Sequence, residues 1–227
     1  MSSLPKTLAE TDDDEFYPSS DGEPVGETDW HIWALILLRE GLEDHFAERQ
    51  DVYVASDLFL YYVKGDRNAS KAPDAMVVKG VAKHFRRSFR TWVEKAMPCV
   101  IIELASGKTW QEDLGPKRAL YARLGVAEYF VFDPEAAYLN PALQGFRLKG
   151  KKYVPLVAAV DESLTSKELG LRLLAEDHML RLIDARTGQP ILTRQERAEQ
   201  EKQRADALEA ELKRLRAAQA KSKGKKR

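Results

Sequence analysis

The chain of 227 residues has a single cysteine, no long apolar run and no net charge, and each absence excludes a class of protein. Cys99 alone cannot form an intramolecular disulfide, and it lies in an apolar run, so we expect a buried, reduced packing residue. The longest uninterrupted apolar stretch, residues 32–38, is too short to span a bilayer, and the acidic start lacks the features of a signal peptide. We therefore expect a cytoplasmic protein that does not engage a membrane.

The charge is balanced in total but uneven along the chain. Lys and Arg number 36 and Asp and Glu number 36, so no overall basic field indicates a polyanionic partner. Residues 12–15 are all acidic, whereas residues 221–227 are mostly Lys and Arg. The four histidines are scattered without a cysteine or histidine at metal-ligand spacing, which argues against a structural zinc site.

Composition divides the chain into four parts. Residues 1–26 combine acids, Ser, Pro and Gly with few apolar residues, which predicts a mobile acidic N-terminal arm. Residues 27–190 have the size and apolar content of one globular domain. Residues 191–220 are dominated by Ala, Glu, Gln, Lys, Arg and Leu, which predicts a long helix, and residues 221–227 form a basic tail.

The predicted long helix carries a weak apolar seam. Ala205, Leu208, Leu212 and Leu215 follow alternating spacings of three and four residues, as in a coiled coil, but Glu201 interrupts the pattern. A self-associating coiled coil and a solvated helix both remain open.

Periodicity within the globular part predicts an α/β architecture with a mixed sheet. Thr28 is suited to cap a helix that runs to about Ala47 and buries Trp30, Trp33 and Leu37. Strands are predicted over 52–54, 58–63, 75–78, 100–104 and 128–132, with a final hairpin of 146–148 and 153–156. A helix over 114–124, ended by a glycine at position 125, makes 100–132 a strand-helix-strand unit.

Two carboxylates stand in strand-like segments. Glu103 ends five consecutive apolar residues, and a carboxylate on such a buried strand requires a partner. Asp74 follows Pro73 at the start of another strand. Carboxylates on two neighbouring strands can hold one hard divalent cation, with waters completing the shell and the carbonyl of Leu104 as a further ligand. The alternative is that Asp74 is a turn residue and Glu103 a charge at a strand end.

Several motifs resemble the Uma-two family of bacterial proteins, which is described as putative endonucleases. The resemblance covers about residues 30–185 and rests on Pro73-Asp74, residues 100–106, the spacing of Asp113, Lys117 and Tyr121, residues 125–130, Asp133-Pro134 and residues 138–145. That family is assigned to the restriction-endonuclease-like PD-(D/E)xK superfamily. The resemblance implies a mixed β-sheet flanked by helices, Mg²⁺ or Mn²⁺ bound by Asp74 and Glu103, a DNA substrate and a homodimer.

The resemblance also implies a lysine that orients or activates the attacking water, and here the chain departs from the superfamily. The lysine normally stands two residues after the glutamate on the same strand face, but that position is Ala105. Lys117, on the following helix, is the leading candidate. Lys108, in the loop after Glu103, is the alternative.

The helix that follows the glutamate strand explains the preference for Lys117. Asp113, Lys117 and Tyr121 are spaced by four and would line one helical face as the helix packs back beside Glu103. Pro116 indicates that the regular helix begins about there, so we expect Asp113 just before it.

Residues 79–95 hold a second candidate feature, a cationic stretch interleaved with aromatics. Lys83, Arg86, Arg87 and Arg90 belong to it, and such a stretch can neutralise phosphates while its aromatics anchor it or stack on bases. A solvated basic face with buried aromatics is the alternative.

The residues and the resemblance together predict a metal-dependent DNA endonuclease. Asp74 and Glu103 would bind the cation, and Lys117 would position the nucleophile and stabilise developing charge. The alternative function is a catalytically inactive nuclease-fold protein that acts in nucleic-acid binding or helix-mediated assembly.

Overall fold

The computed structural model describes residues 16–17 and 27–224, with side chains described up to Arg216. The chain divides into two compact units, residues 1–191 and residues 192–227. Residues 221–224 of the predicted basic tail belong to the C-terminal helix, while residues 225–227 and most of the predicted N-terminal arm lie outside the described residues. Tyr17, which falls within that arm, is buried on the domain, and its hydroxyl accepts a hydrogen bond of 2.7 Å from the Gly65 N–H.

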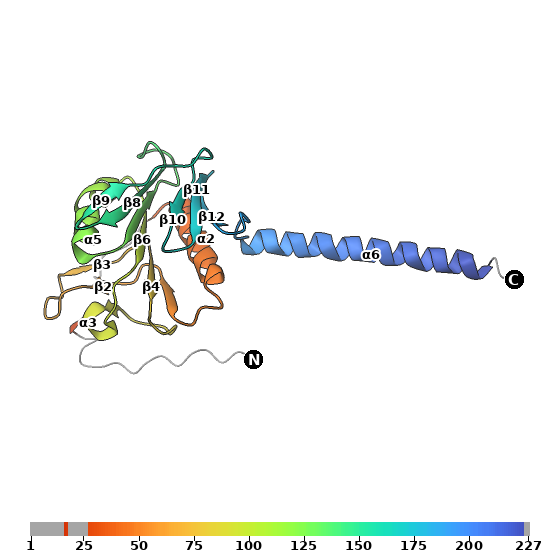
Figure 1. The fold of residues 1–227 in the computed structure, drawn as a ribbon, viewed down its shortest axis with the longest axis horizontal. Helices are drawn as coiled ribbons and strands as arrows, with labels where there is room; N and C mark the ends of the chain where they lie inside the picture. The colour runs from red at the N-terminus through yellow and green to blue at the C-terminus, as the bar shows by residue number, and fades with distance from the viewer. Residues whose placement is uncertain (1–15, 18–26, 225–227) are drawn as a thin grey trace. The chain divides into compact units, whose positions relative to one another are not determined.

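A six-stranded mixed sheet forms the centre of the first unit (Figure 1), in the order β1-β4-β6-β7-β8-β9. The strands are β1 (Val52–Ala55), β4 (Ala75–Lys79), β6 (Val100–Leu104), β7 (Glu128–Phe132), β8 (Leu143–Lys149) and β9 (Lys152–Pro155). β6 and β7 are parallel, and the other neighbours are antiparallel. Every residue of β6 and β7 is buried, as expected for nearly continuous apolar runs.

Helix α2 (Asp29–His45) and a second sheet cover one face of the central sheet. Thr28 caps the helix as predicted, because its hydroxyl accepts the His31 N–H at 3.2 Å. The second sheet is antiparallel and consists of β10 (Leu164–Ser166), β11 (Leu171–Glu176) and β12 (Met179–Asp184). These three strands were not among the predicted ones.

The buried face of α2 differs from the predicted face. The residues that α2 buries are His31, Ala34, Leu35, Leu38 and Leu42. Trp30 and Trp33 are 46% and 44% exposed, and the Trp30 ring stacks on the ring of His178 at the rim of the domain. The helical period was predicted correctly, but the buried face is shifted by about one residue along the sequence. A histidine, rather than a tryptophan, faces inward at the start of the helix.

A second helical segment covers the other face of the central sheet, as α4 (Trp110–Glu112), η1 (Asp113–Lys117) and α5 (Arg118–Leu124). η1 is a π-helical turn that contains Pro116. Proline has no N–H to donate, and its ring would collide with the carbonyl four residues earlier, so a widened turn accommodates it. The helix therefore starts earlier than predicted, and Asp113 lies within it rather than before it. It ends at Gly125, as predicted, with a φ of 86°.

Short elements complete the domain. β2 (Leu60–Tyr61), β3 (Ser70–Lys71) and β5 (Phe89–Arg90) form a small sheet, followed by α3 (Thr91–Glu94). The predicted strand over 58–63 is thus shorter than expected, because its neighbours β3 and β5 each offer only two residues for pairing.

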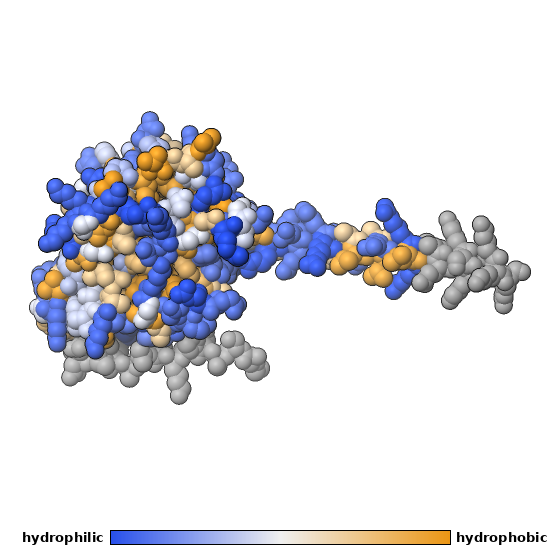
Figure 2. Space-filling view, viewed as in Figure 1, coloured by the Kyte–Doolittle hydropathy of each residue, from blue (hydrophilic) through white to orange (hydrophobic). Residues whose placement is uncertain are grey.

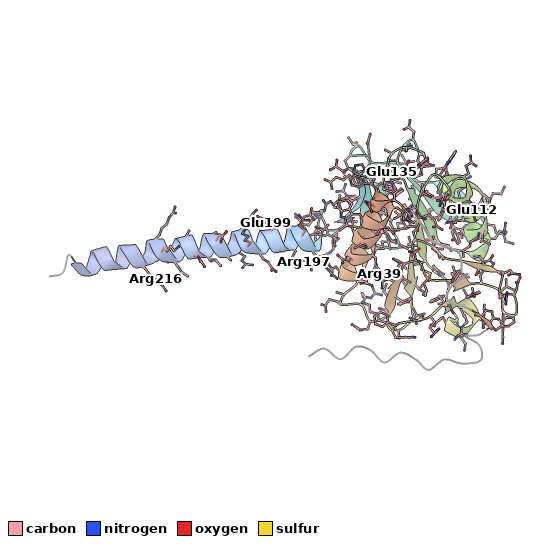
Figure 3. All side chains as sticks on the ribbon, turned by 180° about the vertical axis from the view of Figure 1, so that it is seen from behind. Arg39, Glu112, Glu135, Arg197, Glu199 and Arg216 are labelled. Atoms are coloured by element: carbon pink, nitrogen blue, oxygen red, sulfur yellow. The ribbon has the colours of Figure 1, made fainter. Side chains whose placement is uncertain are left out.

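The second unit consists mainly of α6 (Arg194–Gly224), a helix of 31 residues. Thr193 and Glu196 form a reciprocal capping box: the Glu196 N–H donates to the Thr193 hydroxyl at 3.2 Å, and the Thr193 N–H donates to the Glu196 carboxylate at 2.8 Å. Side chains such as Arg197, Glu199 and Arg216 project from α6 (Figure 3). Among the described residues, no helix is long and apolar enough to cross a membrane.

Candidate active site

Glu103 lies on the face of β6 that the α4-η1-α5 segment covers. Side chains alternate along a strand, so Ile101, Glu103 and Ala105 point to this face, and Ile101 and Ala105 belong to its apolar cluster. Glu103 has no exposed surface. Ala105 is buried in the same layer, so the position two residues after the glutamate holds a small apolar side chain instead of a lysine.

Asp74 meets Glu103 across the neighbouring strand. β4 runs antiparallel to β6 with Ala75 opposite Ile102, which brings the preceding residue beside Glu103. The Asp74 N–H donates to Glu103 Oε2 at 3.3 Å, and the Leu104 N–H donates to Asp74 Oδ2 at 2.6 Å. Leu104 therefore contributes its amide to the site and holds the Asp74 carboxylate in place.

Lys117 reaches the same carboxylate from η1. Its Nζ lies 3.3 Å from Glu103 Oε2 and 2.8 Å from Asp113 Oδ1, the latter as an ion pair rather than an aligned hydrogen bond. One turn further along the helix, the Tyr121 hydroxyl donates to Glu103 Oε1 at 2.9 Å. The Tyr129 hydroxyl donates to the Asp113 carbonyl at 2.9 Å and ties the π-helical turn to β7.

The site has more buried acidic side chains than buried lysines, because Glu103 and Asp113 share Lys117. Burial raises the pKa of Glu103 above its ordinary value; Lys117 opposes this shift, while Asp74 and Asp113 add to it. Burial likewise raises the pKa of Asp113 against the effect of Lys117. Burial alone would lower the pKa of Lys117, but the charges of Glu103 and Asp113 outweigh it and raise that pKa, so the ammonium stays protonated.

His31 is a member of the site that sequence reasoning missed. Its Nε2 lies 3.3 Å from Asp74 Oδ1, and its Nδ1 lies 3.7 Å from Glu27 Oε2. Burial would lower the pKa of His31, but the hydrogen bond and charge of Asp74, followed by the charge of Glu27, raise it. A signal was present in the sequence, because His31 shares its helical stripe with Ala34, Leu38 and other buried residues.

The donor set fits a hard divalent cation bound by two carboxylates. Within residues 16–17 and 27–224, no group of three or more His, Cys, Asp and Glu side chains is arranged as a metal cage. Magnesium does not require one, because it keeps several waters and takes one or two carboxylates together with substrate phosphate. The Asp74 and Glu103 carboxylates meet that need, and a cation between them would counteract the burial and the neighbouring acids that raise the pKa of Glu103.

The alternative lysine is not part of this cluster. Lys108 is exposed in the loop after β6, whereas Lys117 is largely buried beside both carboxylates.

The cationic stretch of residues 79–95 is partly occupied by structural contacts. Arg86 makes a two-point ion pair with Glu94, at 2.8 and 3.0 Å, and its guanidinium lies over the Tyr53 ring at 4.2 Å. Lys83 donates to the carbonyls of Phe46 and Ala47 at the C-terminal end of α2.

The position of Lys83 also separates it from the candidate site. His31 is in the first turn of α2, so about 15 residues, or roughly 22 Å of helix, separate the two ends. Arg87 is exposed and Arg90 is partly buried. A phosphate-binding role for these four residues stays a prediction.

The mixed sheet flanked by helices is a restriction-endonuclease-like fold, and Asp74, Glu103 and Lys117 meet beside its central strands. The fold is similar to the crystal structure of a putative nuclease from Anabaena variabilis ATCC 29413, with a TM-score of 0.50 and 14% identity over 70% of this chain and 87% of that chain. Residues 6–177 match the model of the Uma2 (Uma-two) family, described as "putative restriction endonuclease". Because the match spans well over half of the sequence, the chain belongs to the Uma2 family. None of the curated proteins matches it.

Proposed function

We propose that this protein is a metal-dependent endonuclease that hydrolyses phosphodiester bonds of DNA. One observation carries the proposal: Asp74, Glu103 and Lys117, which are far apart in the sequence, converge on a single buried point beside the central sheet. Membership of the Uma2 family supports a hydrolytic nuclease.

Asp74 and Glu103 would hold Mg²⁺ or Mn²⁺. When bound, the cation supplies neutralising charge at the phosphate and lowers the pKa of a water molecule. Leu104 N–H and His31 fix the Asp74 carboxylate, while Tyr121 fixes Glu103. The Lys117 ammonium, held protonated by its two carboxylate neighbours, would orient the nucleophile and stabilise the charge that develops on the phosphate oxygens.

The test is plasmid cleavage in Mg²⁺ or Mn²⁺ by the wild type and by Asp74→Asn and Glu103→Gln. Each substitution keeps the side-chain shape but removes a charged ligand, so we expect cleavage to fall by at least about 100-fold while circular dichroism shows an unchanged fold. Glu112→Gln is the matched control. Glu112 lies on the same helical segment as Lys117 but pairs with Lys71 on β3, so its variant should cleave normally. Full activity in either site variant would refute the assignment.

One observation favours the second candidate, an inactive nuclease-fold protein that binds nucleic acid. Lys117 is tightly paired with Asp113, and the usual lysine position is occupied by Ala105. Under this alternative the wild type binds DNA without cleaving it in either metal, and Asp74→Asn binds equally well without metal.

We also propose that α6 pairs in parallel with α6 of a second copy. Leu208, Leu212 and Leu215 are each more than half exposed, and Figure 2 shows hydrophobic surface on part of this helix. These leucines and Ala205 would form the seam of the dimer. In a parallel dimer, a residue that flanks the seam on one helix faces the residue five positions later on the other helix.

The flanking charges support the parallel arrangement. The facing pairs would be Arg204 with Glu209 of the partner subunit and Glu211 with Arg216 of the partner subunit, and both pairs attract. An antiparallel pair that buries the same leucines would bring Glu209 close to Glu209 of the partner subunit, and these two charges repel.

A further inference from the structure

A groove between α5 and the edge strand β9 gathers cations from two separate parts of the chain. Its volume is about 480 Å³, and the residues that matter here are Arg118, Arg123, Lys151, Lys152, Phe146 and Tyr153. In Figure 1, α5, β8 and β9 occupy the same side of the domain. The cluster cannot be recognised in any single stretch of the sequence, because a loop, β7 and β8 separate its two halves.

The positive charge of the groove is not compensated. No carboxylate lines it, and within the described part of the chain none of the four cations forms an ion pair with Asp or Glu. Arg123, Lys151 and Lys152 are exposed. Arg118 has its guanidinium over the Phe146 ring at 4.8 Å, which orients its free N–H groups. Arg86, by contrast, is neutralised by Glu94.

The groove and the candidate active site share one face of the central sheet. Phe146 and Tyr153 belong to the same apolar cluster as Ile101 and Ala105, which flank Glu103 on β6. β9 is three strands from β6 in the sheet order, or about 14 Å at 4.8 Å per strand. α5, which supplies Arg118 and Arg123, also continues directly from the turn that carries Lys117.

We propose that the α5-β9 groove binds the sugar-phosphate backbone of the DNA substrate. The proposal rests on the proposed function for the identity of the polyanion. A span of 14 Å corresponds to about four nucleotides at 3.4 Å each, so the groove holds phosphates about four positions from the one at the carboxylates. Lysine and arginine neutralise phosphates without reading bases, so this contact fixes the register of the substrate and is independent of its sequence.

Cations on an edge strand also serve another purpose, because they deter pairing with the edge of another sheet. If the cations had only that role, their removal would leave the affinity for DNA unchanged. A binding measurement therefore separates the two.

The test compares the triple variant Arg123→Gln/Lys151→Gln/Lys152→Gln with the control Lys64→Gln/Arg67→Gln/Lys95→Gln, which removes three exposed cations elsewhere on the domain. Fluorescence anisotropy of a labelled DNA duplex in EDTA, over a series of NaCl concentrations, gives the affinity and its salt dependence. For the groove variant we expect at least about a tenfold loss of affinity at low salt and a salt slope shallower by about 2.7, from 0.9 per phosphate contact. The control should match the wild type.

An equal loss in both triple variants would overturn the proposal, because only total charge would then matter. So would a wild type that binds no DNA. A wild type that does not cleave, but whose binding depends on the groove, would refute the proposed function and leave the groove standing. Cleavage that depends on Asp74, with groove variants that bind as the wild type, would refute the groove alone.

Discussion

Lys117 is the residue on which the candidate chemistry most depends, because it is the only lysine placed against Glu103 among the described residues. It also pairs with two buried carboxylates, so a structural role and the proposed catalytic role would coincide in one side chain. A single substitution cannot separate them, but a pair of substitutions can.

We predict that Lys117→Met lowers cleavage by at least about 100-fold and the free energy of unfolding by about 3–5 kcal/mol, because it leaves buried charges unpaired. Adding Asp113→Asn removes one of those charges and should restore most of the stability but none of the cleavage. Urea unfolding and plasmid cleavage measure the two effects. Cleavage that recovers together with stability would show that Lys117 is structural only.

Cys99 gives a second prediction at this scale, one that depends on pH. Its thiol donates to the Val77 carbonyl at 3.3 Å, and burial raises its pKa to about 11. Only the thiolate attacks a disulfide reagent, so at pH 8 the reactive fraction is about one in a thousand. The folded protein should react with a chromogenic disulfide at least 100-fold more slowly than in denaturant.

The same shift sets the sign of a stability effect. The folded state holds this proton more tightly than the unfolded state, so the contribution of Cys99 is present below pH 9 and is lost as the pH rises toward 11. Rapid labelling of the folded protein at pH 8 would contradict both statements.

At the scale of single residues, sequence reasoning found the carboxylates but misjudged others. Asp74 and Glu103 stood out because acids are rare in buried strands. Glu128 is also an acid at the end of a predicted strand, yet it is buried on the opposite face of the sheet, where Arg147 and Ser166 bind it. An acid at a strand end can face solvent, enter a site or pair with buried partners. Only the register of the sheet decides which of these occurs.

At the scale of elements, the π-helical turn and the second sheet show what periodicity cannot reach. Pro116 was interpreted as a helix start, but the chain absorbs it by widening one turn. β10, β11 and β12 were missed although apolar residues alternate along them.

The second sheet packs closely against the central sheet at Gly145. At Gly145 on β8, an added Cβ would lie 2.8 Å from the Phe130 ring and 2.9 Å from Leu164 of β10, so the two sheets touch at a residue without a side chain. Such a close approach is a tertiary property. Neither strand alone predicts it.

At the scale of the whole molecule, the proposed parallel pairing through α6 predicts a dimer in solution. Leu208→Lys/Leu212→Lys places charges in the seam and should shift the mass found by sedimentation equilibrium from twice 25.7 kDa to 25.7 kDa. Gln203→Lys/Ala210→Lys adds the same charges on the outer side of the helix and should remain dimeric. A wild type that sediments as a monomer would exclude the pairing.

The separation in sequence of the site residues has a consequence for the biosynthesis of the protein. His31 comes from the first helix of the domain and Lys117 from a turn after the third central strand, and the Tyr129 hydroxyl that secures this turn comes from the fourth. A nascent chain still on the ribosome, or a proteolytic fragment that ends before β7, contains the carboxylates without the clamp on their lysine. The candidate site is therefore complete only after β7 has been synthesised, and a product truncated before β7 should lack the proposed cleavage activity.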